Sequence, residues 1–341
     1  FLPIVFLAII ILVSAAHGAD RGARSKAAKP ALVPVIELPW RRVAHNPELP
    51  EIGTKPGAVV DHCFFEAADG HWELWTQIRG TAKGRLFFRW EGTKQFDRAD
   101  WTPRRICWRA DPKYGESIGT AKDNDMIQAP FVYSENGKYT VYYGGGPRGD
   151  GPGHQICTAT SDDGIKFVRT KDAQGRSRVF AGPGRSRDAM ILKIGDRYFC
   201  YYCADENGKG VIALRTTKDL ASGKWSDYSV ASRGGILGTH NCSQQCPFVV
   251  YRHGWYYLFK MAYSNEYRTA VYASKDPAFF GHEDDSLVAM LPASAAEIIR
   301  VGEQDYISSL IPGYGGVRIA RLNWAQRKIP FFQTKEKVAV E

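Results

Sequence analysis

The chain has 341 residues, of which 44% are hydrophobic and 24% are charged, which is ordinary for a folded soluble protein with a large buried core. Its formal net charge of +9 would suit an acidic polymer, either nucleic acid or an anionic polysaccharide. However, Lys and Arg are dispersed and form no run interleaved with aromatic residues. We therefore expect a solvated basic surface and no nucleic-acid partner.

The first segment, residues 1–19, contains no Lys, Arg, Asp or Glu and holds an apolar run followed by small residues. This pattern is typical of a secretory signal, and the run is short for a membrane span, which needs roughly 20 apolar residues. We predict a signal peptide cleaved after Gly18, with an uncleaved anchor as the alternative. Residues 20–40 are expected to form a flexible basic linker. The mature protein would be secreted or periplasmic, without stable membrane association.

Five later segments repeat one plan, in which an extended apolar stretch is followed by a Gly or Asp turn, an aromatic strand and a further strand. They recur about every 50 to 70 residues. Aligned at their leading residues, the segments begin at Asp61, Gln128, Asp188, Gln245 and Ala296. The predicted strands lie within residues 59–92, 128–167, 187–225, 245–280 and 295–324.

Period-two alternation, β-branched and aromatic residues and polar turns in every repeat predict short strands. Repetition of the whole unit favours a propeller over a β-sandwich. The expected fold is all-β, a single-domain five-bladed β-propeller over residues 41–330, with few short helices and a C-terminal tail at 331–341.

In a propeller the innermost strand of every blade lines a central channel. The leading residues Asp61 and Asp188, together with Arg187, should therefore meet in one funnel. Two carboxyl groups in such a pocket suit the cleavage of a glycosidic bond, because one can attack or activate water while the other protonates the leaving oxygen. The alternative is that both aspartates only cap strands or turns.

From about residue 55 to 325, the sequence resembles the five-bladed propeller glycoside hydrolases of families 43 and 32. The resemblance rests on Asp61 ahead of DGHWELW, on the RDAMILKIGDRYFCYY segment that contains Asp188, and on the QCPFVVYRHGWYYLF segment that begins at Gln245. The members of this superfamily include arabinanases, β-xylosidases and invertases. The resemblance implies an oligosaccharide or polysaccharide substrate and no organic cofactor.

Carried over to this chain, the resemblance makes Asp61 the general base or nucleophile. Asp188 becomes the residue that stabilises the transition state or raises the pKa of the acid, and Arg187 would bind a substrate hydroxyl or an anionic group. Gln245, ahead of Cys246 and Pro247, falls where the family has its acidic Glu.

An amide cannot donate a proton as a carboxylic acid does, and general acid catalysis commonly contributes about 10²–10⁴ in rate. Several interpretations stay open. The proton could come from His240, in GTHNCSQQC, since His titrates near neutrality. The protein could cleave only activated or unusual substrates, or it could be a sugar-binding pseudoenzyme. A Glu-to-Gln substitution introduced to trap a complex and a protein-binding scaffold are the remaining alternatives.

Other residues have weaker claims to the site. Gln128 opens the second repeat, and the glycine-rich run 144–153 that follows predicts a loop over the channel rim, with Arg148 and His154 available for substrate binding. That run lacks the Lys-Ser/Thr of a P-loop. Glu297 is a weaker alternative acid than His240. His62 should alternate away from the channel if Asp61 points into it.

The seven cysteines show no matched pair of CxxC motifs, so a zinc site is not expected, and most are read as small buried hydrophobes. Parts of family 43 hold a calcium ion with a His in the fifth repeat. The corresponding segment here, PASAAEII, has no His, so we predict no metal there. The function expected from the sequence is thus a secreted glycoside hydrolase acting on a furanoside or related plant or algal glycan. A catalytically impaired carbohydrate-binding protein is the alternative.

Overall fold

The computed structural model describes residues 30–52, 57–98, 100–116, 125–146, 155–262 and 267–326. Within these ranges the chain is all-β, with three short 3₁₀ segments and no α-helix. None of the helical segments described is long and apolar enough to cross a bilayer. The predicted signal peptide, residues 20–29 of the predicted linker and the predicted tail lie outside the described residues.

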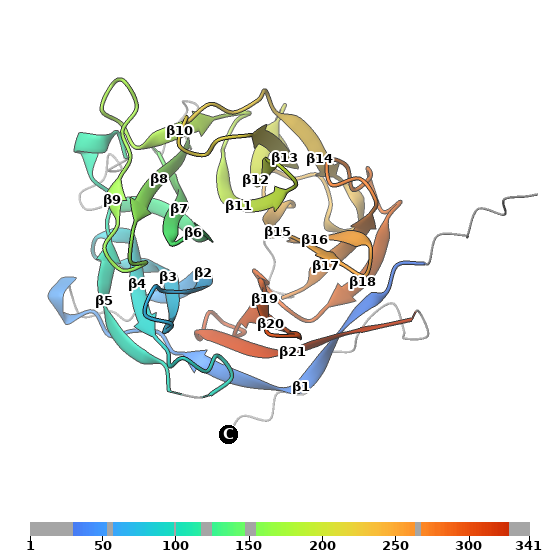
Figure 1. Ribbon diagram of the computed structural model, residues 1–341, viewed down its shortest axis with the longest axis horizontal. Helices are drawn as coiled ribbons and strands as arrows, with labels where there is room; N and C mark the ends of the chain where they lie inside the picture. Colours follow the sequence, from blue (N-terminus) through green and yellow to red (C-terminus); the bar gives the residue numbers. More distant parts are fainter. Residues whose placement is uncertain are drawn as a thin grey trace, which may run out of the picture. The chain divides into compact units, whose positions relative to one another are not determined.

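The strands form antiparallel sets that are arranged radially, with the first strand of each set nearest a common centre (Figure 1). A short parallel pairing of β4 with β6 joins the first two sets into one sheet. In chain order the leading strands are β2 (Ala58–Glu66), β6 (Asp125–Glu135), β11 (Arg187–Ile194), β15 (Gln245–Arg252) and β19 (Ile298–Val301). The strands that follow them are β3 (Trp72–Thr81), β4 (Gly84–Glu91) and β5 (Thr102–Trp108); β7 (Lys138–Gly145), β8 (Gln155–Ser161), β9 (Val168–Arg169) and β10 (Arg178–Ala181); β12 (Arg197–Glu206), β13 (Lys209–Thr217) and β14 (Ser229–Arg233); β16 (Trp255–Met261), β17 (Thr269–Ser274) and β18 (Leu287–Leu291); and β20 (Gln304–Leu310) and β21 (Val317–Ala325). The 3₁₀ segments are η1 (Pro50–Ile52), η2 (Pro112–Tyr114) and η3 (Gly235–Leu237).

The set led by β19 is completed by the first strand of the chain, β1 (Val33–Ala44), which pairs antiparallel with β21 (Figure 1). The pairing runs from Val33 opposite Ala325 to Ala44 opposite Val317. The prediction of a flexible linker is therefore wrong for residues 33–40, because these residues belong to β1. The physical reason is that Ile36 packs into a core cluster with Ile307 of β20 and Leu322 of β21.

The hydrophobic core lies between neighbouring sets of strands. One cluster joins Phe65, Trp75 and Phe87 of the β2 set to Val141 and Tyr143 of the β6 set. Aromatic side chains such as Trp75 and Tyr143, on the second strands of their sets, therefore pack between sheets. This packing holds each leading strand in place, so that the starts of these strands surround one small cavity.

Candidate active site

A repeated backbone feature shapes the wall of that cavity. Ala129, Asp188, Cys246 and Ala295 all adopt positive φ angles, between 45° and 54°, which non-glycine residues seldom do. In β6, β11 and β15 this residue lies inside a register shift against the following strand, as in a β-bulge. All four residues line the cavity, so they are structurally equivalent positions.

This equivalence corrects the alignment of the repeats. The sequence pattern placed Gln128, Gln245 and Ala296 at the position of Asp188, but Cys246 has the backbone geometry of Asp188, and Gln245 corresponds to Arg187. The error arises because a bulge adds one residue to a strand, whereas the alternation of buried and exposed residues assumes a strict period of two.

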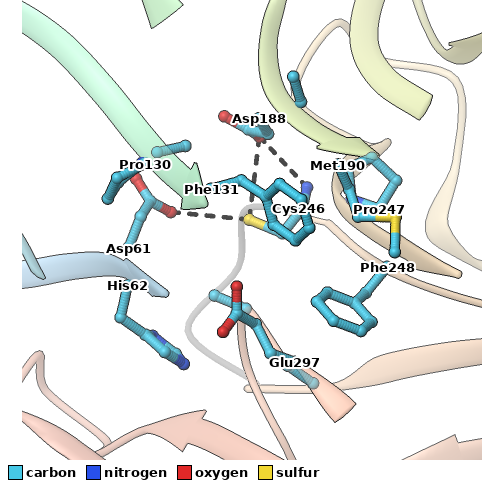
Figure 2. Close-up of a pocket in the computed structure, with 14 residues that line it drawn as sticks. Asp61, His62, Pro130, Phe131, Asp188, Met190, Cys246, Pro247, Phe248 and Glu297 are labelled. Atoms are coloured by element: carbon cyan, nitrogen blue, oxygen red, sulfur yellow. Dashed lines mark hydrogen bonds between the residues drawn. The ribbon is translucent and has the colours of Figure 1, made fainter. Parts of the chain in front are cut away.

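The cavity has a volume of about 40 Å³. It is open on one side and bounded by the starts of the leading strands. Figure 2 shows the thiol of Cys246 between the carboxyl groups of Asp61 and Asp188. The lining residues are Asp61, His62, Ala129, Pro130, Phe131, Asp188, Ala189, Met190, Cys246, Pro247, Phe248, Ala295, Ala296 and Glu297.

Cys246 connects the two carboxyl groups. Its thiol donates to Oδ1 of Asp61 at 3.6 Å and to Oδ2 of Asp188 at 3.8 Å. Burial, followed by the charges of Asp188 and Asp61, raises the pKa of the Cys246 thiol well above its ordinary value. The thiol therefore keeps its proton and can act as a hydrogen-bond donor to either carboxylate.

Asp188 is surrounded by hydrogen-bond donors. Its Oδ2 atom accepts from the Cys203 thiol at 3.0 Å and from the backbone N–H of Cys246 at 3.2 Å. The Nε atom of Arg187 lies 3.9 Å from the same oxygen. Burial lowers the pKa of the Arg187 guanidinium, but the charge of Asp188 raises it overall. Two hydrogen-bond donors and one positively charged side chain therefore surround this carboxyl oxygen.

Asp61 lies in a different electrostatic environment. Burial is the main cause that raises the pKa of its carboxyl group to about 7, and the charge of Asp188 raises it further, against the lowering effect of Arg85, Cys246 and Arg187. Asp61 therefore binds its proton more tightly than an ordinary carboxyl group does, because burial and a neighbouring carboxylate both oppose its ionisation.

Solved structures with the same fold share this arrangement of sheets. A thermostable family-43 glycoside hydrolase superposes with a TM-score of 0.56 at 17% identity, covering 82% of this chain and 95% of its own. An exo-1,5-α-L-arabinanase from a bovine ruminal metagenomic library matches with a TM-score of 0.56 at 16% identity, over 78% of this chain and 92% of the other. The family-32 β-fructofuranosidase of Bombyx mori matches with a TM-score of 0.58 at 16% identity, over 80% of this chain and 61% of its own.

This chain has the propeller fold of the family-43 and family-32 glycoside hydrolases. No model of a protein family matches its sequence, and no curated protein sequence matches it significantly. The chain spans less than two thirds of the length of the Bombyx mori enzyme. The resemblance expected from the short motifs is thus confirmed at the level of the fold.

Within this propeller fold, Gln245 and His240 do not belong to the wall of the cavity. The Gln245 amide donates to the backbone oxygen of Cys242 at 2.8 Å, within its own turn. His240 is exposed in the connection between η3 and β15, and its Nδ1 accepts from the backbone N–H of Cys242 at 3.3 Å. The structure therefore does not bring His240 to the carboxyl pair.

The remaining predicted binding residues fall in two groups. Gln128 is buried beside the site, where its Oε1 accepts from Arg85 Nη1 at 2.6 Å. Arg85 thus binds Gln128, and its positive charge lowers the pKa of Asp61. Arg148 and His154, predicted on the rim loop, lie outside the described residues.

Two titratable residues at the cavity have structural partners. Oε2 of Glu297 accepts from the backbone N–H of Phe64 at 2.9 Å, and burial raises the pKa of Glu297 well above its ordinary value. His62 lines the cavity, contrary to the expectation that it would alternate away, and its Nε2 lies 2.7 Å from Oγ of Ser308. Burial lowers the pKa of His62 to about 3, so this ring stays neutral.

Sequence reasoning missed Cys246, Cys203 and Arg85 as neighbours of the carboxyl pair. Cys246 was noticed only as a residue beside Gln245, and the other two lie on second and third strands, which the search for leading residues passed over. In the described part of the chain, no three His, Cys, Asp or Glu side chains are placed to hold a metal ion.

Proposed function

We propose that this chain is a secreted glycoside-hydrolase-like protein with a five-bladed propeller, acting on a furanoside or related plant or algal oligo- or polysaccharide. Support for the blade count comes from the five leading strands, each followed by antiparallel partners. Support for the substrate class comes from neighbours that are described as an arabinanase, a β-fructofuranosidase and a β-xylosidase. The uncharged apolar run in residues 1–19 supports export.

One observation carries the proposal: the Cys246 thiol touches both Asp61 and Asp188, so the two carboxyl groups face one small cavity. Glycosidic bond cleavage needs a proton donor together with a negative group that opposes the positive charge of the oxocarbenium-like transition state. A carboxyl pair that holds one proton can supply both.

The contacts suggest which residue has which role. Asp188, which accepts hydrogen bonds from Cys203 and Cys246 beside Arg187, would be the carboxylate that stabilises positive charge at the anomeric carbon. Asp61, whose pKa is raised to about 7, would protonate the leaving oxygen. This assignment differs from the base or nucleophile expected for Asp61 from the family resemblance, and it explains how a site without the acidic Glu could work.

A second function, carbohydrate binding without turnover, is favoured by the size of the cavity. Its 40 Å³ can hold a few water molecules, each of which needs at least about 10–15 Å³, but no sugar ring. Turnover would require the side chains around Cys246 to move apart. Phe131 and Phe248, whose rings meet at 6.1 Å, line the same cavity and would be the first to shift.

The test is hydrolysis of aryl glycosides and of arabino-, xylo-, fructo- and galacto-oligosaccharides by the purified protein and its Asp61→Asn variant. Turnover by the wild type that is lost in the variant supports the enzyme. The Asp61→Asn amide keeps the shape of the acid but cannot donate its proton.

Two further variants separate the alternatives. His240→Ala removes an exposed imidazole outside the cavity wall and should retain activity. Gln245→Glu puts a carboxyl group at the position that the sequence pattern assigned to the acid, one residue before Cys246 in the cavity wall. If the wild type binds a sugar without cleaving it and Gln245→Glu gains turnover, the binding function replaces the proposed enzyme.

A further inference from the structure

A second, larger cavity lies at the other end of the strands from the carboxyl pair. It is an open groove of about 860 Å³, within the range of about 300–1,000 Å³ that is usual for ligand sites. Strand β6 connects the two places, since Ala129 lines the small cavity and Glu135 lines the groove. The lining residues of the two cavities that come nearest along this strand are Phe131 and Tyr133, and no residue lines both cavities. The groove is therefore distinct from the proposed active site.

The floor of the groove carries hydroxyl groups where a blade would normally bury apolar side chains. Tyr133 pairs with Thr140 across β6 and β7, and Thr140 pairs with Thr160 across β7 and β8. All three residues line the groove, as do the next pair along the sheet, Tyr142 and Thr158. Tyr142 and Thr158 are almost fully buried, so this sheet face presents Tyr133, Thr140 and Thr160 toward the open space.

Residues of the neighbouring set close the other side. Tyr198, at the start of β12, lines the groove together with the turn at residues 219–223. Its ring lies edge-on to that of Tyr133, with 5.8 Å between the centroids. Aromatic rings beside hydroxyl groups suit a sugar, which has apolar ring faces and a polar edge.

The charged residues of the groove mostly neutralise one another. Lys138 Nζ lies 2.5 Å from Asp162, and Arg176 Nε lies 2.9 Å from Asp172. Glu135 accepts from Lys193 at 2.5 Å and from the Tyr198 hydroxyl at 2.6 Å, and the Asp219 carboxylate accepts from the backbone N–H of Ala221 at 2.9 Å. The Nζ of the remaining lysine, Lys171, lies 5.5 Å from the centre of the Tyr114 ring.

Arg178 is the exception. It is half-buried at the start of β10 and lines the groove, but its guanidinium has no hydrogen bond or ion pair with any side chain or backbone group of the described residues. A guanidinium has five N–H donors in a planar fork that matches a carboxylate. An arginine held in a groove without such a partner is suited to receive one from a ligand.

We propose that this groove binds an acidic oligosaccharide, with a uronic acid carboxylate on Arg178 and neighbouring sugar hydroxyls on the Thr and Tyr side chains of the β7–β8 face. The site would hold a glycan chain without cleaving it, because Asp61 and Asp188 line the small cavity and not the groove. The inference does not depend on turnover in the small cavity, so the two proposals can fail separately.

The experiment is calorimetric titration of the full chain with hexagalacturonate at low ionic strength, compared with neutral xylohexaose. We expect binding of the acidic ligand to be tighter than that of the neutral one. Arg178→Gln should weaken hexagalacturonate binding by about 10- to 100-fold, as is typical for loss of a hydrogen bond to a charged group. Thr140→Val should weaken it less.

Two controls make the result specific. Arg105→Gln removes the same charge from an exposed position on β5, outside the groove, and should leave the dissociation constant unchanged. Asp61→Asn should also bind hexagalacturonate normally. The proposal is overturned if the wild type does not bind the acidic ligand, if Arg178→Gln binds it as well as the wild type does, or if Asp61→Asn abolishes binding, which would place the ligand in the small cavity.

Discussion

Asp188 and Cys246 occupy the same position at the start of neighbouring leading strands, with φ angles of 54° and 49°. The two positions have nearly the same φ angle. However, the Asp188 carboxylate accepts hydrogen bonds, whereas the Cys246 thiol donates one. The bulge is therefore a feature of the fold, whereas the side chain at its tip determines whether the position accepts or donates a hydrogen bond. A neutral donor at position 246 allows two carboxyl groups to face one cavity without a third negative charge.

Replacing the carboxylate of this pair should have the largest effect. Asp188→Asn keeps the shape of the side chain but removes the charge opposite Arg187, and we expect kcat/KM to fall by about 10²–10⁴ on any substrate that the wild type cleaves. The pKa of Asp61 should fall as well, since the charge of Asp188 helps to raise it. Steady-state kinetics and a pH profile measure both effects. An unchanged kcat/KM would remove Asp188 from the proposed mechanism.

Making the two positions alike should destabilise the fold. Cys246→Asp adds a third carboxyl group near Asp61 and Asp188, and two unit charges about 4 Å apart repel by about 4 kcal/mol in a surrounding of intermediate polarity. We expect the free energy of unfolding in urea to fall by a few kcal/mol at pH 8 and by less at pH 5, where protons relieve the repulsion.

Cys246→Ser is the matched control, because it keeps a small neutral donor at the bulge. Its free energy of unfolding should stay close to that of the wild type. Equal stability of Cys246→Asp and Cys246→Ser at pH 8 would show that the two aspartates do not interact with position 246 as the structure indicates.

The free energy of unfolding should depend on pH because Asp61 binds its proton more tightly in the folded state. The pKa of Asp61 rises from 3.8 to about 7 on folding, so between these values the folded state binds more protons than the unfolded state. The contribution is fully present below about pH 4 and is lost as pH rises to about 7, with a slope of about 1.4 kcal/mol per pH unit. Asp61→Asn should remove this slope and be more stable than the wild type above pH 7, as measured by urea denaturation.

The smallest effect is expected at His240. Because this exposed ring lies outside the cavity wall, His240→Ala should change kcat/KM by less than about twofold and leave its pH profile intact. A large loss together with the disappearance of a limb near neutral pH would instead make His240 the replacement acid that the sequence suggested.

The sequence revealed most of the architecture because the repeats carry it directly. Alternating apolar residues and aromatic second strands predicted the β2, β6, β11 and β15 sets, and both aspartates were expected at the starts of their strands. The one-residue offset at Gln245 could not be predicted, since a bulge leaves no mark in a period-two pattern. The partners Cys203 and Arg85 depend on which strands meet in space, and local sequence does not contain that information.

The first strand of the chain also limits when the fold can form. Val33 pairs with Ala325 in β21, so the ring of sheets is closed by residues from opposite ends of the sequence. A ribosome must therefore translate about 290 further residues before β1 can find its partner, and this non-local pairing must form late. During that interval the backbone N–H and C=O groups along the unpaired edge of β1 are available for pairing with the wrong strand.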